Sequence, residues 1–324
     1  MITDKNTKEN DKTKVYAARI KDRSVLLNSS SGGMFTALSD SVLSNFGAVA
    51  CSIYNYKERR TEYKLITDIP QRDEARGSKY MQSNPLNIFD ECVMWLKNNP
   101  DKKLLFVGTG CYAAGFKSFI KTKGLEQRTY IVDLICYGAP SPKLWGEYAA
   151  YLEKRCGGIS SNLNFKDKRN GWNTPTAVMK INGEEVFLKE FTRFFNTNCA
   201  LRPSCYKCPY ATIKRSTDMT IGDFWGIENA LPDFYDKNGN SLVLIHTKKG
   251  EELFKSVEEK IDFSESTVED CLQPNLQRPT SMPDKRTVFW QDYSKQGIEY
   301  MIKKYGTSSF VNRVKSKIKR ILKR

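Results

Sequence analysis

The sequence predicts an α/β (α+β) fold. A mostly parallel sheet is flanked by helices, with an inserted cysteine-containing β-rich segment and a C-terminal basic helix. Strand-length apolar runs alternate with helix-like segments up to residue 157, which is the pattern of a parallel sheet. Several of these runs end in glycine-rich loops that lead into helices. Beyond residue 158 the pattern changes to short strand-like segments joined by turns.

The chain divides into three parts. Residues 1–14 are polar and charged, lack the apolar core of a signal peptide, and are expected to be a disordered lead-in. Residues 15–282 form the main domain, with an N-terminal α/β part at 15–157 and a C-terminal β-rich part at 158–282. Residues 283–324 hold C-terminal helices and a basic tail. No apolar run is long enough to cross a membrane, and we expect a cytoplasmic protein.

The first half contains a loop–helix–strand segment followed by two strand–loop–helix units. Residues 29–46 open with small residues and continue with helically spaced apolar residues, and residues 48–54 follow as a buried strand. After a polar connection at 72–83 and a helix at 86–98, a strand at 104–107 leads into a helix that Cys111 opens. A strand at 130–135 carries Cys136 at its end, and another helix begins near Pro142.

In the second half, Asn182–Gly183 is a hairpin signal between two short strands. Strands are expected at 218–223 and 241–247, a helix from Lys249, and a further helix at 283–305. Because ligands bind beyond the carboxyl ends of parallel strands, Cys111 and Cys136 are expected at the rim where ligands bind.

The net charge of +15 is unevenly distributed. The last fourteen residues hold seven Lys or Arg and no acid, so the remainder is only mildly basic and nucleic acid is not the expected partner. Residues 310–324 have an apolar helical face, which suits a helix on an anionic membrane surface, peripheral to the inner face of the membrane. A helix that packs on its own domain is the alternative.

Nine cysteines and one histidine restrict the chemistry. In a chain without secretion signals the thiols are expected to stay reduced, and any metal site is expected to be all-thiolate. The strongest local signal is Cys205 and Cys208, a C-x2-C pair in a loop braced by Pro203 and Pro209. The alternatives are two chance cysteines in a surface loop, or a redox dithiol.

Cys111 and Cys136 are the candidates for the other two ligands. Each would more often be a small core residue when taken alone, but both lie at one rim in glycine-rich turns. Four thiolates suit a [4Fe–4S] cluster or an all-cysteine zinc site. The remaining cysteines are expected to be packing residues, with Cys199 a rival ligand: Cys51, Cys92, Cys156, Cys199 and Cys271.

Three further segments offer groups for a ligand. Ser31, Gly32 and Gly33 precede a helix and form either an anion cradle or an ordinary serine cap. GSKY at 77–80 suits a phosphate or ribityl chain, or is a solvated turn. IGDFWG at 221–226 places Asp223 and Trp225 at a strand end, where they either contact a flat cofactor or form a core corner. His246 follows an apolar strand and is expected to be structural.

Six segments in this order resemble the coenzyme F420 hydrogenase/dehydrogenase β-subunit family, in particular a bacterial branch associated with exopolysaccharide biosynthesis. They are SSSGGMFTAL, RGSKYMQS, LLFVGTGCYAAGF, VDLICYGAPSPKLW, FKDKRNGW and LRPSCYKC with STDMTIGDFWGI. The resemblance covers about residues 15 to 260, and the ordered set is more specific than any single motif.

The resemblance implies a flavoprotein that binds FAD and a [4Fe–4S] cluster. The cofactor-binding positions it implies are Ser31, Gly32, Gly33, Ser78, Lys79, Tyr80, Gly108, Thr109 and Gly110, to which the strand-end pattern adds Asp223 and Trp225. The cysteines that match its motifs are Cys111, Cys136, Cys205 and Cys208. No catalytic acid or base is implied, because the family transfers electrons through its cofactors.

Two departures from the family pattern affect the residues beside the ligands. The usual Thr-Pro-Cys-Gln is Thr109 to Tyr112 here, and the usual Cys-His-Gly is Cys136 to Gly138. No cysteine-dense ferredoxin domain precedes Cys51, so the expected electron partner is a ferredoxin-like protein or a reduced soluble cofactor.

The predicted function is a flavin- and [4Fe–4S]-dependent oxidoreductase that serves capsule or exopolysaccharide biosynthesis. The alternative is a non-catalytic accessory protein, in which the all-cysteine site is structural and the basic tail docks the protein to membrane-bound glycan machinery. A basic RNA-binding protein with a zinc site is a third, weaker interpretation.

Overall fold

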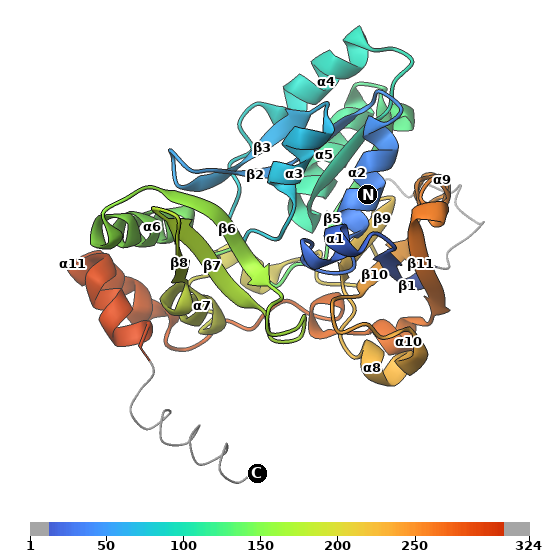
Figure 1. Ribbon diagram of the computed structural model, residues 1–324. Coiled ribbons are helices and arrows are strands. Elements are labelled where there is room, and N and C mark those ends of the chain that lie inside the picture. The colour runs from blue at the N-terminus through green and yellow to red at the C-terminus, as the bar shows by residue number, and fades with distance from the viewer. Residues whose placement is uncertain (1–12, 308–324) are drawn as a thin grey trace.

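The computed structural model describes residues 13–307, and its centre is an eight-stranded sheet in the order β11-β1-β10-β9-β5-β4-β2-β3 (Figure 1). Its strands are β1 (Lys14–Ile20), β2 (Ala48–Asn55), β3 (Arg60–Ile66), β4 (Leu104–Thr109), β5 (Thr129–Leu134), β9 (Met219–Asp223), β10 (Ser241–Ile245) and β11 (Ile261–Ser266). The pairs β2–β4, β4–β5 and β5–β9 are parallel. The outer pairs are antiparallel. The predicted α/β class is confirmed, with parallel strands at the centre of a mixed sheet.

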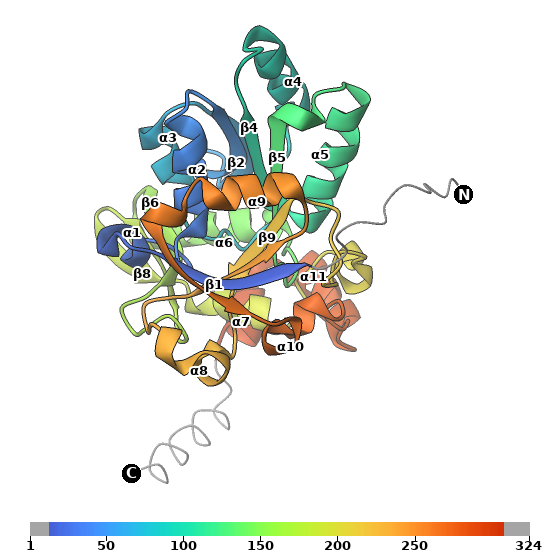
Figure 2. The same cartoon turned by 90° about the vertical axis from the view of Figure 1, so that its right-hand side faces the viewer.

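Helices cover both faces of this sheet (Figure 2). On one face lie α2 (Met34–Leu43), α3 (Ile69–Ala75) and α9 (Lys248–Lys255); on the other lie α4 (Ile88–Asn98) and α5 (Gly110–Thr122). Leu105 and Val107 of β4 enter the first core, whereas Leu104 and Phe106 enter the second. Because successive strand residues point to opposite faces, a continuous apolar run is what a sheet covered on both sides requires.

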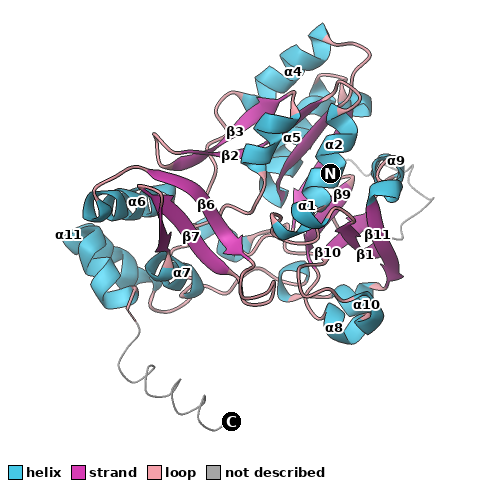
Figure 3. Ribbon diagram, viewed as in Figure 1, coloured by secondary structure: helices cyan, strands magenta, loops and turns pink. Residues whose placement is uncertain are grey.

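A smaller three-stranded sheet stands beside the large one (Figure 3). It consists of β6 (Ser160–Asp167), β7 (Thr176–Ile181) and β8 (Glu184–Phe187), and it packs with α6 (Pro142–Cys156), α7 (Lys189–Asn196) and α11 (Arg286–Tyr305). Its core is rich in fully buried aromatic side chains, among them Trp145, Phe191 and Phe289. The predicted hairpin is confirmed, since Asn182 and Gly183 have φ angles of 51° and 83° between β7 and β8.

The remaining regular elements are short. They are α1 (Arg23–Leu27), α8 (Ile227–Ala230), α10 (Val268–Cys271) and the 3₁₀ helices η1 (Glu126–Arg128), η2 (Pro203–Lys207), η3 (Pro232–Phe234), η4 (Glu258–Lys260) and η5 (Pro274–Leu276). Among residues 13–307, no helix is both long and apolar enough to cross a membrane.

Several sequence-based boundaries shift. β1 begins at Lys14, within the expected lead-in, and the expected polar connection at 72–83 starts inside α3. The small sheet begins at Ser160, close to the expected change at 157/158, but β9, β10 and β11 return to the large sheet, so the two parts share it. The amphipathic tail at 310–324 and residues 1–12 lie outside the described residues.

Candidate metal centre and adjoining recess

Three central strands end side by side. In the register of β4, β5 and β9, Thr109 lies opposite Leu134, and Leu134 lies opposite Ile221. Cys111, Cys136 and Asp223 each follow two residues after this row. Parallel neighbours are about 4.8 Å apart, so the strand ends bring together three of the predicted site residues.

The loop after β5 pairs with the segment that carries the C-x2-C motif. Pro140 and Leu201 form an isolated antiparallel bridge, and the amide of Arg202 donates to the carbonyl of Ala139 at 3.0 Å. The next residues form η2, which contains Cys205. This pairing, between segments more than 60 residues apart in sequence, therefore places Cys205 and Cys208 close to Cys136.

The four predicted cysteines lie within electrostatic reach of one another. Burial raises the pKa of Cys136 to about 12, and the thiolates of Cys205, Cys111 and Cys208 act in the same direction. Burial also raises the pKa of Cys208, with the thiolates of Cys111 and Cys205 contributing to the rise. Burial and mutual repulsion thus favour neutral thiols here, and a bound cation would be needed to hold all four as thiolates.

Each of the four sulfurs has a hydrogen-bonding partner. The amide of Gly138 donates to Cys136, that of Tyr210 to Cys208, and that of Ala139 to the Cys205 sulfur at 3.5 Å. The fourth sulfur, that of Cys111, lies 3.3 Å from the hydroxyl of Thr109. Hydrogen bonds to cysteine sulfur stabilise the thiolate and help to set the reduction potential of an iron–sulfur cluster.

Two glycines allow the loops to approach this closely. Gly138 has a φ of 136°, and a Cβ there would lie 2.8 Å from Leu201 Cδ1 and 3.4 Å from Cys205 Cβ. A Cβ at Gly110 would lie 2.8 Å from both the guanidinium of Arg215 and the Cβ of Tyr210. Gly110 thus lets the segment after Cys208 close over the start of α5, whereas Gly108 faces the Tyr63 hydroxyl inside the sheet.

Within residues 13–307, no group of three or more His, Cys, Asp or Glu side chains is arranged to hold a single metal ion. Thiolates around one tetrahedral zinc ion would be about 3.8 Å apart, given zinc–sulfur bonds of about 2.3 Å. In a cubane cluster each thiolate binds a different iron, so the ligand sulfurs stand farther apart than around one ion.

The other cysteines are mostly core residues, as the sequence predicts. Cys51, Cys92, Cys199 and Cys271 are buried in four different apolar clusters. Cys199, the rival ligand, is 3% exposed and packs in the aromatic core of the small sheet. Cys156 differs from the prediction, because it is the last residue of α6 and its side chain is exposed rather than packed.

A polar recess adjoins the cysteines on the side of the small sheet. Lys166 of β6 forms an ion pair with Asp223, and the indole nitrogens of Trp172 and Trp225 lie 3.4 Å from the same carboxylate. Burial raises the pKa of Tyr80. Lys166, Asp223 and Cys136 lie close enough to Tyr80 to act on that pKa electrostatically. Tyr80 therefore connects the recess to the cysteine site.

An aromatic cavity of about 150 Å³ opens beside Tyr80 and Lys166. Phe165, Phe191 and Phe195 line it, and the ring of Tyr80 lies edge-on to Phe165 with centroids 5.6 Å apart. The lining of flat rings with one ammonium suits the stacking of one planar ring, because the cavity is smaller than the roughly 300–1,000 Å³ of sites that enclose a whole ligand.

The serine–glycine loop before α2 is held on several sides. The amide of Gly32 donates to the Ser241 hydroxyl at 2.9 Å, and the Ser31 hydroxyl donates to the carbonyl of Asn240 at 2.9 Å. Gly33, with a φ of 83°, is the N-cap of α2, and no side chain caps that helix. The alternative of an ordinary serine cap is therefore not observed. The Gly32 amide is already bonded to Ser241, so only the amides at the start of α2 are left to bind an anion.

GSKY lies against this loop. The amide of Ser78 donates to the Ser30 hydroxyl at 2.7 Å, which joins two of the predicted ligand segments. Lys79 donates to the carbonyls of Ala75 at 2.7 Å and Gly77 at 3.0 Å, and burial lowers its pKa to about 8. A phosphate at Lys79 would compete with these carbonyls.

Lys166, Lys168 and Arg215 are site residues that sequence reasoning did not select. Lys168 donates to the carbonyls of Ser31 at 2.7 Å and Leu26 at 2.9 Å, and burial lowers its pKa to about 7. The sequence FKDK at 165–168 could have indicated Lys166 and Lys168, because alternate residues of a strand point to the same side. Arg215 had no comparable signal, because only its position beside Gly110 reveals its role.

The model of the family described as the C terminus of the coenzyme F420 hydrogenase/dehydrogenase beta subunit matches residues 101–270, more than half of the chain. The chain belongs to this family. The match includes Cys111, Cys136, Cys205 and Cys208, so the candidate metal centre lies inside the family region. Membership indicates a redox-related role of the hydrogenase or dehydrogenase β-subunit kind.

The fold also resembles that of a solved chain. A structure of the F420-reducing [NiFe] hydrogenase complex from Methanosarcina barkeri has a TM-score of 0.53 to this chain, with 17% identity and 90% of each chain covered. Among curated proteins, none matches the chain.

Proposed function

We propose that this protein is a flavin- and [4Fe–4S]-dependent oxidoreductase. Cys111, Cys136, Cys205 and Cys208 would hold the cluster. The observation that carries the proposal is the gathering of these four thiolates beyond the strand ends, each sulfur with a hydrogen-bonding partner. Thiols that only fill a core need no such partners, whereas cluster ligands depend on them.

The recess supports a flavin beside the cluster. It combines the flat rings of the aromatic cavity with the ammonium of Lys166, and the uncapped start of α2 offers backbone amides to a phosphate. When bound, FAD supplies two-electron chemistry and the cluster supplies one-electron chemistry. FAD is the flavin that the family resemblance implies.

The chain's own residues would bind and orient these groups. Burial lowers the pKa of Lys166, but its interactions with Tyr80 and the Asp223 carboxylate raise it above the usual value overall, so Lys166 stays an ammonium. A fixed cation at the recess attracts an anionic ligand group. Lys168 draws together the carbonyls of Leu26 and Ser31, which holds the loop before α2 in place.

One observation favours the accessory-protein alternative, in which the four thiolates have a structural role only. The tyrosines that replace the usual family residues form structural hydrogen bonds: Tyr137 donates to Asn198 Oδ1 at 2.6 Å, and Tyr112 donates to the carbonyl of Ser83. The sequence has thus adapted these two positions to packing. Service in polysaccharide biosynthesis, the ferredoxin-like partner and a place at the inner membrane surface stay predictions.

Anaerobic purification with analysis of iron, sulfide, zinc and flavin distinguishes the two functions. The oxidoreductase requires about four irons and four sulfides per chain together with bound flavin. A colourless protein with one zinc per chain would support the accessory protein instead.

A substitution then tests the recess itself. Lys166→Met should lower the flavin content while the iron content stays at the wild-type value, because the ammonium of Lys166 pairs with Asp223 rather than with a cysteine. Lys154→Met, at an exposed position of α6, is the control and should retain both. Equal flavin content in the two variants would show that Lys166 does not contribute to flavin binding.

A further inference from the structure

Cys111 is the exposed member of the candidate cluster ligands. Its side chain is solvent-exposed, whereas those of Cys136, Cys205 and Cys208 are partly covered. If these four residues hold a cluster, the edge at Cys111 is the closest to solvent. An external electron carrier would therefore approach from the side of α5.

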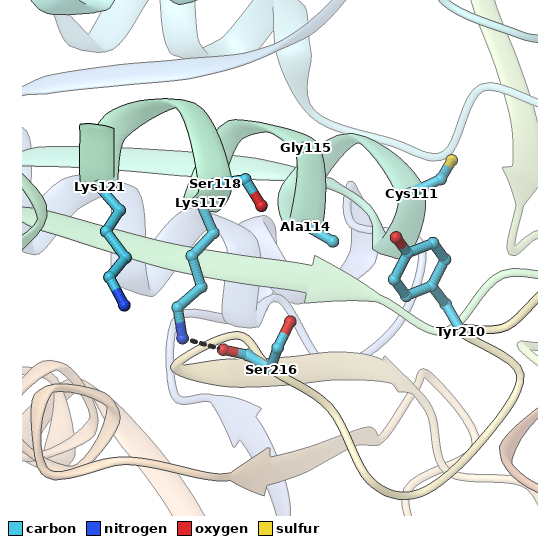
Figure 4. Close-up of a pocket in the computed structure, with 8 residues that line it drawn as sticks. All are labelled: Cys111, Ala114, Gly115, Lys117, Ser118, Lys121, Tyr210 and Ser216. Carbon is cyan, nitrogen blue, oxygen red and sulfur yellow. Dashed lines mark hydrogen bonds between the residues drawn. The ribbon is translucent and has the colours of Figure 1, made fainter. Parts of the chain in front are cut away.

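A shallow cavity of about 450 Å³ extends from Cys111 along the outer face of α5 (Figure 4). Ala114, Gly115 and Ser118 provide small side chains along this face, and Tyr210 and Ser216 of the loop after the cysteine pair close its other side. Because residues three or four apart in a helix share one face, Cys111, the small residues and Lys121 lie in one row.

The charge of this face has a single sign. The charged side chains that line the cavity are Lys117 and Lys121, and the lining holds no Asp or Glu. Lys117 and Lys121 point along the same side of α5 in Figure 4, and neither forms an ion pair among the described residues. The ammonium of Lys117 donates to the carbonyl of Ser216, a contact that fixes its position without neutralising its charge.

We propose that this basic face of α5 is the docking surface for an acidic one-electron carrier protein, and that electrons enter beside Cys111. The inference rests on the proposed function. One electron leaves the reduced carrier and arrives at the cluster, without bond formation or proton transfer. Opposite charges steer the encounter, and the small residues let the carrier approach the cysteine edge.

Binding of a plant-type ferredoxin, an acidic carrier, tests the proposal without relying on turnover. The variant is Lys117→Glu with Lys121→Glu, and the matched control is Lys248→Glu with Lys255→Glu on α9, which covers the opposite face of the sheet. Wild type should bind ferredoxin less tightly as salt rises, and the α5 variant should lose about tenfold or more in affinity at low salt. The control should stay within about twofold of wild type.

Equal affinity of the two double variants would overturn the proposal, as would wild-type binding that does not weaken with salt. A second measurement separates this outcome from failure of the proposed function. Dithionite, which needs no docking surface, should bleach the cluster absorption equally in wild type and in the α5 variant. If dithionite bleaches nothing in any of these proteins, the proposed function fails instead.

Discussion

The buried ion pair beneath the cysteine loop provides a quantitative test of the structure. Arg215 and Asp133 have side chains only 2% and 1% exposed, and a guanidinium nitrogen lies 2.8 Å from Asp133 Oδ2. The Thr220 hydroxyl donates to the other carboxylate oxygen. Arg215→Met leaves a buried carboxylate with neutral hydroxyl partners only, and losing one member of such a pair costs about 3–5 kcal/mol. That is a large part of a stability of about 5–15 kcal/mol.

The loss should depend on pH. Burial raises the pKa of Asp133 above its usual value, and the Arg215 charge opposes this rise, so the variant should have a still higher pKa in the folded state. A folded state with the higher carboxyl pKa holds a proton that the unfolded chain has lost, so stability falls as pH rises through this window. The deficit of Arg215→Met should therefore be smaller at pH 5 than at pH 7.5.

Urea unfolding followed by tryptophan fluorescence at both pH values measures the effect. The control is Lys214→Met, at the neighbouring position, which should change the unfolding free energy by no more than about 0.5 kcal/mol. An Arg215→Met deficit as small as that of the control at pH 7.5 would refute the reasoning. So would a deficit that grows as the pH falls.

Two further substitutions test packing. Gly138→Ala should lower the iron content and reduce the unfolding free energy by roughly 1–3 kcal/mol, because the added methyl group would press on Leu201 at a residue of positive φ. The control is Gly124→Ala, which also has a positive φ but lies in open space and should keep the iron. Similar iron loss in both variants would contradict the proposed role of Gly138 in the loop. Phe191→Ala should cost about 3–5 kcal/mol in urea unfolding, because the ring is fully buried in the aromatic core; a loss below about 1 kcal/mol would contradict that burial.

The central part of the fold was predictable because its signals are local. The runs that became β2, β4 and β5 are mostly apolar, Gly110 follows β4 directly, and Gly138 lies in the loop after β5. Parallel strands end at one edge, so Cys111 and Cys136 were assigned to a common rim from the chain order alone. β1 and β11, in contrast, alternate buried with more exposed residues, and their places in the sheet depend on pairing between segments more than 200 residues apart in the chain.

The recess was less predictable because its contacts are long-range. The Gly32 amide is bound by Ser241, more than 200 residues later, so a sequence motif could not show that the amide is already bonded. Lys79 resembles a phosphate ligand in GSKY, but the carbonyls at the end of α3 occupy its ammonium. Lys166 reaches Asp223 only because the small sheet packs beside the large one.

Cysteine substitution with iron and sulfide analysis tests the central claim most directly. Cys111→Ser, Cys136→Ser, Cys205→Ser and Cys208→Ser, purified without oxygen, should each lose most of the iron, the sulfide and the visible cluster absorption. Cys92→Ser, the same change at a fully buried core position, should retain all three. Retention of a full complement of iron and sulfide in any of the four would contradict the assignment of that thiolate as a ligand.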